Sequence, residues 1–327
     1  MGFLKYCDIC GSINLKENNF CIHCGCEFVS ENICPHCGEI NQNNALFCIK
    51  CNNQINPLAI DSFDTLFSDY NKNLLLNAQI SDIEYNELLS NIFMRADYIE
   101  IYGDSVKNKI LNLAGIFTRC IPKSRGYERG FIFANGIYYD DRLDDSVQIA
   151  TIIHELSHYL LSSIIENLMC KIFKVKSSSC LQSFVWYFLT LPEFKIMNEY
   201  CAHTVEGRFI PYGYQNYGTF NALVSSAVID DDSLDDMVIF GNTFANEIIV
   251  YLEKYIDEEL REEIKIQYRK DLSKPTYDSI FKETNDSLPL NLKNKVLINI
   301  LYNVFESVSK SSDDLEELES IKESIES

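Results

Sequence analysis

Apolar residues in the middle of the chain recur at the spacing of an α-helix. They fall on one side of a helical projection: Ile149, Ile152, Ile153, Leu156 and Leu160. This spacing predicts a helix whose apolar side is buried while its other side faces something else. Asp144, Asp145 and Ser146 stand just before the run, and residues of these types are typical of a helix start.

Further helices are predicted on both sides of this one. Ser81-Asp82-Ile83-Glu84 is a capping box, and we expect two or three helices before residue 120. A helix opened by the Thr/Glu capping pair and the early proline of Thr190-Leu191-Pro192-Glu193 is expected to end at Gly207. The remaining apolar patterns predict helices over 180–190, 244–268 and 290–308.

A β-hairpin is predicted just before the central helix. Two runs rich in β-forming residues, Phe131–Ala134 and Ile137–Tyr139, flank Asn135-Gly136, and Asn-Gly is the strongest short hairpin signal. A small sheet or hairpin among many helices predicts a mostly helical domain of the α+β class.

Composition and charge narrow the class of protein. The 327 residues are 46% hydrophobic, which is typical of a globular chain with one good-sized core and a small accessory module. A net charge of −20, from 48 acidic against 28 basic residues, disfavours nucleic acid and anionic membrane surfaces as partners. No apolar run is long enough to span a membrane, and the N-terminus carries no secretory signal, so we expect a cytoplasmic protein.

Eight of the 13 cysteines form four CxxC pairs near the N-terminus. They are Cys7, Cys10, Cys21, Cys24, Cys34, Cys37, Cys48 and Cys51, and the second four repeat the first at a constant offset of 27 positions. Four thiolates complete a tetrahedral zinc site and leave no open position. The pattern therefore predicts two structural zinc ions, and it resembles a tandem zinc ribbon with modules at 1–29 and 30–55.

The charge of the two ribbons bears on their partner. Residues 1–56 contain three basic side chains, Lys5, Lys16 and Lys50, against five acidic ones, whereas a nucleic-acid reader carries a basic stripe. We expect a protein partner or docking within the chain, and the alternative is that the ribbons are stability devices without a partner. A linker and first helix are expected over 56–75.

The predicted central helix carries the sequence His154-Glu155-Leu156-Ser157-His158. On a helix, His154 and His158 lie one turn apart on one face, where they can hold a single zinc ion, and Glu155 can reach a water there as general base. This stretch resembles the active-site helix of the zincin metallopeptidases. The resemblance implies a zincin-like domain over 76–308. It also implies that Ile137–Asp140 is the edge strand that binds substrate, with an ordinary exposed hairpin as the alternative.

A catalytic zinc needs a third protein ligand, and the helix after Pro192 offers candidates. Glu199, His203 and Glu206 fall on one face of that helix. Asn198-Glu199 resembles the gluzincin arrangement, which implies Glu199 as the third ligand, although His203 stands where that pattern has an aspartate. His203 is then a partner of the site or an electrophile that stabilises an oxyanion. The alternative is that His203 is the third ligand and Glu199 orients it.

These patterns together predict a cytoplasmic zinc metallopeptidase with one catalytic and two structural zinc ions, acting on a peptide or protein. An acidic tail is expected over 309–327, as a partner helix or a frayed end. The alternative function is a non-catalytic adaptor or sensor whose ribbons bind a protein. A SprT-like protease acting at DNA is disfavoured by the acidic balance, by the N-terminal position of the ribbons and by the absence of that family's later histidine pattern.

Overall fold

The computed structural model describes residues 4–6, 13–15, 32–33, 38–41, 50 and 60–327, apart from 124–128, 273–279 and 281. The chain divides into two compact units. One comprises Met1–Ala59 with Lys174–Lys176, and the other comprises Ile60–Phe173 with Ser177–Ser327. The stretch expected to form a linker and first helix, 56–75, therefore crosses the boundary between the units.

The described residues of the N-terminal unit form two short antiparallel pairs of strands. Strand β1 (Leu4–Tyr6) pairs with β2 (Ile13–Leu15), and β3 (Asn32–Ile33) pairs with β4 (Ile40–Asn41). Tyr6 lies opposite Ile13 in the first pair and Ile33 opposite Ile40 in the second, so the pairing repeats at the same offset as the cysteines. The eight cysteines lie outside the described residues, and the two ribbon zinc sites stay predictions.

The larger unit is mostly helical with one small sheet, which confirms the predicted α+β class. Its helices are α1 (Phe63–Leu66), α2 (Asp69–Leu76), α3 (Asp82–Asp97), α4 (Val106–Phe117), α5 (Asp145–Phe173), α6 (Ser179–Thr190), α7 (Pro192–Phe209), α8 (Gly218–Ser226), α9 (Asp231–Leu252), α10 (Glu258–Asp271), α11 (Leu290–Val308) and α12 (Ser312–Glu326). The predictions over 180–190 and 290–308 are confirmed by α6 and α11. Among the described residues before 120 the chain forms four helices, one of them a single turn, in place of the two or three expected.

Local capping explains where several helices begin. Ser81 and Glu84 form the predicted capping box at the start of α3. Pro192 is the first residue of α7, as predicted. The predicted Thr/Glu capping pair does not form, because the Thr190 hydroxyl donates to the Tyr187 carbonyl oxygen instead. The helix also continues past Gly207 to Phe209.

The single helix predicted over 244–268 is wrong. The chain forms two helices there, with α9 ending at Leu252 and α10 beginning at Glu258. The reason is a local cap, since the Asp257 side chain accepts a hydrogen bond from the Leu260 backbone N–H and starts a new helix.

The sheet has three strands in the order β5-β7-β6, where β5 is Arg119–Pro122, β6 is Gly130–Phe133 and β7 is Gly136–Tyr139. The β6–β7 hairpin is confirmed, although its turn is formed by Ala134 and Asn135, and Ala134 has a φ of 48°. The expectation that residues 137–140 form an edge strand is wrong, because β5 pairs in parallel with β7 and makes it the central strand. Strands β5 and β6 are the two edges of this sheet.

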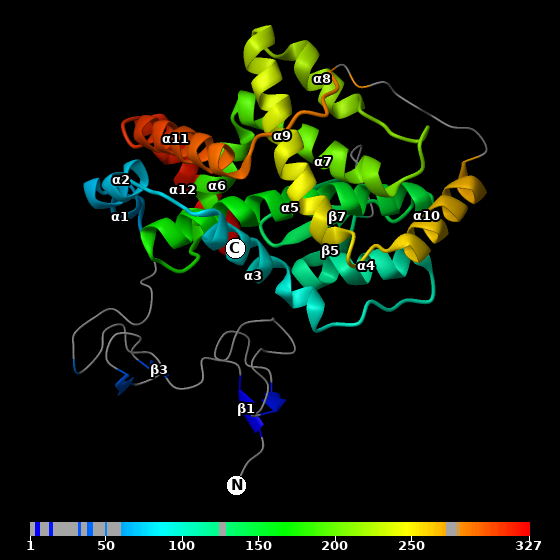
Figure 1. Cartoon of the computed structure of the whole chain (residues 1–327), viewed down its shortest axis with the longest axis horizontal. Helices are drawn as coiled ribbons and strands as arrows, with labels where there is room; N and C mark the ends of the chain where they lie inside the picture. Colours follow the sequence, from blue (N-terminus) through cyan, green and yellow to red (C-terminus); the bar gives the residue numbers. More distant parts are fainter. Residues whose placement is uncertain are drawn as a thin grey trace. The chain divides into compact units, whose positions relative to one another are not determined.

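Helix α5 lies at the centre of the larger unit and packs against β6, β7 and most of the helices (Figure 1). Its five periodic apolar residues are at most 1% exposed, as the pattern predicted. Glu155 and His158 are also buried, so the second side of α5 is covered as well. That side faces α7 and the sheet.

The acidic tail expected over 309–327 is a helix of the larger unit. Helix α12 packs against α6, and its Leu318 is fully buried. The Tyr187 hydroxyl donates to Asp314 Oδ1 at 2.9 Å. The chain therefore continues its packed unit beyond the expected domain boundary at residue 308.

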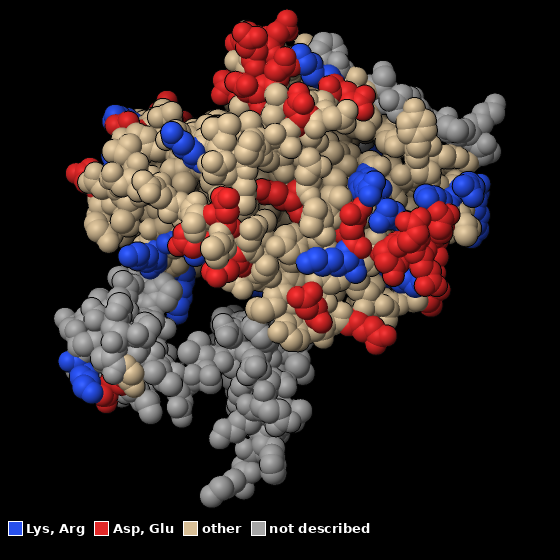
Figure 2. All heavy atoms as spheres, in the orientation of Figure 1, with Lys and Arg blue, Asp and Glu red and all other residues tan. Residues whose placement is uncertain are grey.

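Many charged side chains lie on the surface of the unit. Figure 2 shows carboxylates gathered at the end of α9 that begins at Asp231 and on α10, where basic side chains lie among them. Among the described residues, none of the helices has the length and apolar character that crossing a membrane requires.

Helices α7 and α9 approach closely at Gly241, and this contact supports the segment of α7 that carries Glu199. A β-carbon at Gly241 would lie 2.6 Å from the Met197 carbonyl oxygen. We expect Gly241→Ala to lower the free energy of unfolding by about 1–3 kcal/mol, because the two helices would have to separate. Denaturant unfolding measures the effect.

Gly115 on α4 is the matched control, since a β-carbon there meets no described atom within 4 Å. Gly115→Ala is expected to raise stability by up to about 1 kcal/mol through helix propensity alone. Equal stabilities for the two alanine variants would contradict the close α7–α9 contact.

Candidate metal centre

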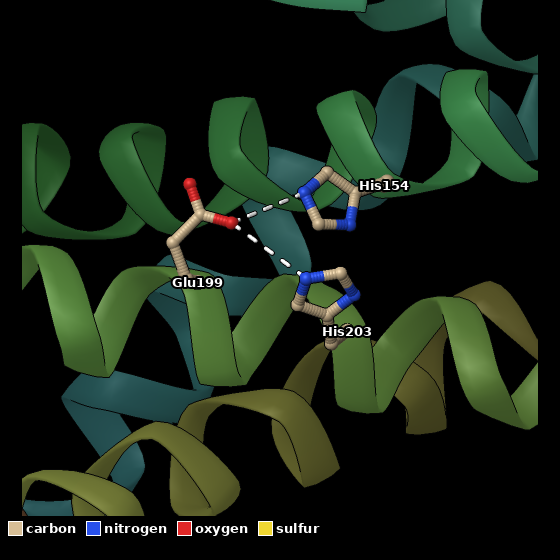
Figure 3. Close-up of side chains that lie close together, drawn as sticks. All are labelled: His154, Glu199 and His203. Carbon is tan, nitrogen blue, oxygen red and sulfur yellow. Dashed lines mark ion pairs between the residues drawn. The ribbon is translucent and has the colours of Figure 1, made fainter. Parts of the chain in front are cut away.

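Two neighbouring helices bring the predicted site residues together. Helix α5 supplies His154, Glu155 and His158, and helix α7 supplies Glu199 and His203. In Figure 3 the Glu199 carboxylate points between the imidazoles of His154 and His203, which come from the two facing helices. The predicted site residues of the larger unit therefore share one small region.

The distances between donor atoms suit a zinc ion held by the expected ligands. His154 Nε2 lies 3.1 Å from His158 Nε2 and 3.5 Å from Glu199 Oε2, and His158 Nε2 lies 3.8 Å from Glu199 Oε1. Zinc binds such donors at about 2.0–2.1 Å, so the donors of a tetrahedral site lie about 3.3–3.4 Å apart. His154 Nε2 is close to that spacing from both neighbours, and Glu199 contacts the two histidines through different carboxylate oxygens.

His203 reaches the same place. Its Nε2 atom lies 3.8 Å from Glu199 Oε2, and one donor atom each from His154, Glu199 and His203 fall within 4.8 Å of one another. The two residues considered for the third ligand are thus both present. Glu199 lies between the histidines, within 3.8 Å of all three imidazoles.

The opposite sides of the imidazole rings also have partners. His154 Nδ1 lies 3.1 Å and His203 Nδ1 lies 3.5 Å from Glu206 Oε2, while His158 Nδ1 lies 2.7 Å from Asn198 Oδ1. A hydrogen bond at Nδ1 leaves the Nε2 lone pair for a metal. The sequence predicts that Glu206 shares a helix face with Glu199 and His203. No local pattern predicts its contact with His154 of α5.

Burial and neighbouring charge set the ionisation of the group. Burial by itself raises the pKa of Glu199 and of Glu206, but the adjacent imidazoles, His154 first among them, lower each to about 2. Burial opposes the charged form of His154, and the two carboxylates nevertheless raise its pKa well above the usual value. The pKa of His203 is lowered, mainly by burial. Both glutamates are therefore carboxylates at neutral pH, the form that binds metal.

Glu155 lies beside this cluster and under the sheet. It is buried, and burial raises the pKa of its carboxyl group. A β-carbon at Gly130 of β6 would lie 3.4 Å from Glu155 Cγ, so the strand passes directly over this side chain. A carboxylate with a raised pKa is a better proton acceptor than an exposed one.

Two buried atoms of the cluster support a metal at this place. Glu199 Oε2 and His203 Nε2 are buried and have no hydrogen-bond partner among the described residues. Buried polar atoms nearly always have a hydrogen-bond partner, and a buried polar atom without one usually has a bound ligand or a functional reason. A cation among the Nε2 atoms and the Glu199 carboxylate would satisfy both.

Comparisons with known proteins add no family to this description. No family model, no curated protein and no solved structure matches the chain. The fold and the site define a mostly helical α+β protein with a buried His/Glu cluster that could hold a metal ion.

Proposed function

We propose that this chain is a zinc-dependent hydrolase of peptide bonds, with the zinc held by His154, His158 and Glu199 and with Glu155 as general base. The observation that carries the proposal is the convergence of His154, His158 and Glu199. They meet next to the buried carboxyl group of Glu155, which shares helix α5 with the two histidines. A zinc ion with two histidines and a glutamate is a common hydrolytic arrangement.

The chain's own residues divide the chemistry between them. A zinc ion bound there would polarise the scissile carbonyl and acidify a water. Glu155 accepts a proton from the attacking water and returns it to the leaving amine. His203 is close enough to the cluster to donate a hydrogen bond to the oxyanion that develops on the carbonyl.

Strand β6 offers a place for the substrate backbone. It pairs with β7 on one side, and the described part of the sheet places no strand on its other side. An extended peptide can add to such an edge through main-chain hydrogen bonds. Since Gly130 lies against Glu155, a peptide on β6 would run next to the general base.

The proposal also assigns a role to the N-terminal unit. Two further zinc ions would be bound by the eight cysteines with a structural role, and the ribbons would contact a protein partner or substrate. We also propose a cytoplasmic location, because thiols spaced for metal binding need a reducing compartment. The acidic balance of the chain favours neither nucleic acid nor a membrane surface as partner.

A second function is favoured by one specific observation. If His203 binds the metal together with His154, His158 and Glu199, four protein donors close the site, as in zinc sites without turnover. The protein would then be a zinc-binding adaptor or sensor whose ribbons bind a partner.

Substitution of His203 separates the two functions. In the hydrolase, His203→Ala is expected to keep the zinc and to lower kcat on a cleaved peptide about 100-fold, the usual effect of losing one oxyanion donor. Zinc content and hydrolysis of a peptide library are measured on the same samples. Loss of zinc from His203→Ala, with no cleavage by the unsubstituted protein, would establish the adaptor instead.

A further inference from the structure

We infer that Glu206 is a positioning residue whose buried carboxylate orients the proposed metal ligand His154 from across the α5–α7 interface while it also contacts the ring of His203. The inference rests on the metal site of the proposed hydrolase but not on hydrolysis itself. Glu206 Oε2 lies 3.1 Å from His154 Nδ1 on α5 and 3.5 Å from His203 Nδ1 on α7. One oxygen atom therefore faces the same nitrogen of both rings.

The side of the ring that Glu206 contacts determines its role. A neutral imidazole carries its proton on one nitrogen and a lone pair on the other. A carboxylate at Nδ1 keeps the proton there, so the lone pair is left on Nε2. The Nε2 atoms of His154 and His203 are the ones that lie 3.5 and 3.8 Å from Glu199 Oε2. Glu206 thus turns the Nε2 lone pair of His154 toward Glu199 and fixes the ring of His203 beside it.

The third histidine is held differently. His158 Nδ1 lies 2.7 Å from Asn198 Oδ1, which belongs to a neutral amide. Asn198 and Glu206 both come from α7, so this helix holds the rings of α5 in register as well as its own His203. Of these two residues Glu206 alone carries charge, and it alone serves two rings.

Burial makes the Glu206 contacts effective. Glu206 is 8% exposed, and the contact joins α5 to α7 across their interface. A carboxylate at Nδ1 makes the Nε2 atom a stronger metal donor. Loss of such a partner usually lowers the metal affinity by roughly 10–100-fold. Because the contact between Glu206 and His154 is buried, we expect removal of the carboxylate to lower the zinc affinity by about 100-fold.

The test compares Glu206→Gln, Glu206→Ala and Glu193→Gln in the full-length protein. Glu193 is on the same helix and exposed, so it is a matched control for removing one carboxylate. Affinity for zinc is measured by competition with a chelator, and cobalt in place of zinc reports the ligand set by its absorption spectrum. Thermal unfolding of the metal-free proteins reports any general loss of structure.

We expect zinc affinity to fall about 10-fold in Glu206→Gln and about 100-fold in Glu206→Ala, with Glu193→Gln unchanged. The smaller effect of glutamine follows because its amide oxygen can still accept from an Nδ1–H. The cobalt spectrum of Glu206→Gln should keep the band pattern of the unsubstituted protein. Unchanged affinity, or lower thermal stability alone, would show a merely structural role and overturn the inference.

Two further results would also overturn it. Complete loss of metal from Glu206→Gln with a changed cobalt spectrum would make Glu206 a ligand, with the metal on the Nδ1 side. The second result comes from nitrogen NMR of the unsubstituted protein with zinc bound. This measurement reports the tautomer of each of the five histidines, and it does not depend on whether the variants fold. His154 protonated at Nδ1 supports the inference, and His154 protonated at Nε2 contradicts it. Absence of hydrolysis would sink the proposed function and leave these measurements unaffected.

Discussion

Replacing Glu155 with glutamine is expected to reduce peptide hydrolysis by at least 100-fold, since general base catalysis contributes about 10²–10⁴-fold to a rate. Glutamine keeps the shape of the side chain but cannot accept a proton from water. Burial raises the pKa of Glu155, so the carboxylate is poised to take that proton, and the amide has no equivalent. Cleavage of a peptide by the zinc-loaded variant measures the effect.

Zinc content should be unchanged in Glu155→Gln, because the proposed ligands are His154, His158 and Glu199. Glu166→Gln is the control, since it makes the same substitution farther along α5, where the Glu166 carboxylate accepts a hydrogen bond from Ser177. That variant should cleave at the rate of the unsubstituted protein. Full hydrolytic activity in Glu155→Gln would show that the proposed mechanism is wrong.

The largest expected effect on stability lies away from the metal site, at a buried ion pair between α9 and α11. Lys293 is fully buried, and its Nζ lies 2.9 Å from Glu247 Oε1 and 3.4 Å from the centre of the Tyr85 ring. The Tyr85 hydroxyl donates to Glu247 Oε2 at 2.7 Å. We expect Glu247→Gln to lower the free energy of unfolding by about 3–5 kcal/mol, because it leaves a buried ammonium group unpaired.

A double variant separates the loss of the pair from the loss of packing. Adding Lys293→Met to Glu247→Gln removes the unpaired charge and keeps an apolar side chain of similar length among Tyr85 and Phe244. The double variant should recover most of the lost stability, since replacing a buried ion pair by apolar groups is often neutral or stabilising. A double variant no more stable than Glu247→Gln would contradict this explanation.

Stability should also depend on pH through Lys293. Burial lowers the pKa of Lys293 from 10.5 to about 8 in the folded protein, against the attraction of Glu247. Between those two values the unfolded chain holds the proton and the folded chain does not. The contribution of this group to the free energy of unfolding therefore rises with pH across that window. Unfolding measured at pH 8 and pH 10 should show a smaller rise in Lys293→Met than in the unsubstituted protein.

The sequence predicts the helices best where short-range signals specify them. Ser81 and Glu84 satisfy each other's backbone within one turn, and the start of α3 follows from those residues alone. Strand β5 had no such signal. Its four residues form a strand through parallel pairing with β7, so its existence depends on packing that brings two distant segments together. The addition of β5 is also why the predicted edge strand lies in the middle of the sheet.

The site shows the same division between local and long-range information. His154 and His158 share a face of α5 because of helical spacing, which the sequence states directly. Glu199 and His203 are one turn apart on α7, and both reach the imidazole of His154 once the two helices pack. Spacing along one helix could not choose between them. Their distances depend on how close α7 lies to α5.

The crystal structure of the zinc-loaded protein, with the metal located by its anomalous scattering, tests the central claim most directly. We predict a zinc ion within about 2.0–2.2 Å of the Nε2 atoms of His154 and His158 and of a carboxylate oxygen of Glu199. Glu155 should lie beside it without binding it. A zinc ion held anywhere else in the larger unit, or no zinc between α5 and α7 in a fully loaded protein, would contradict the account.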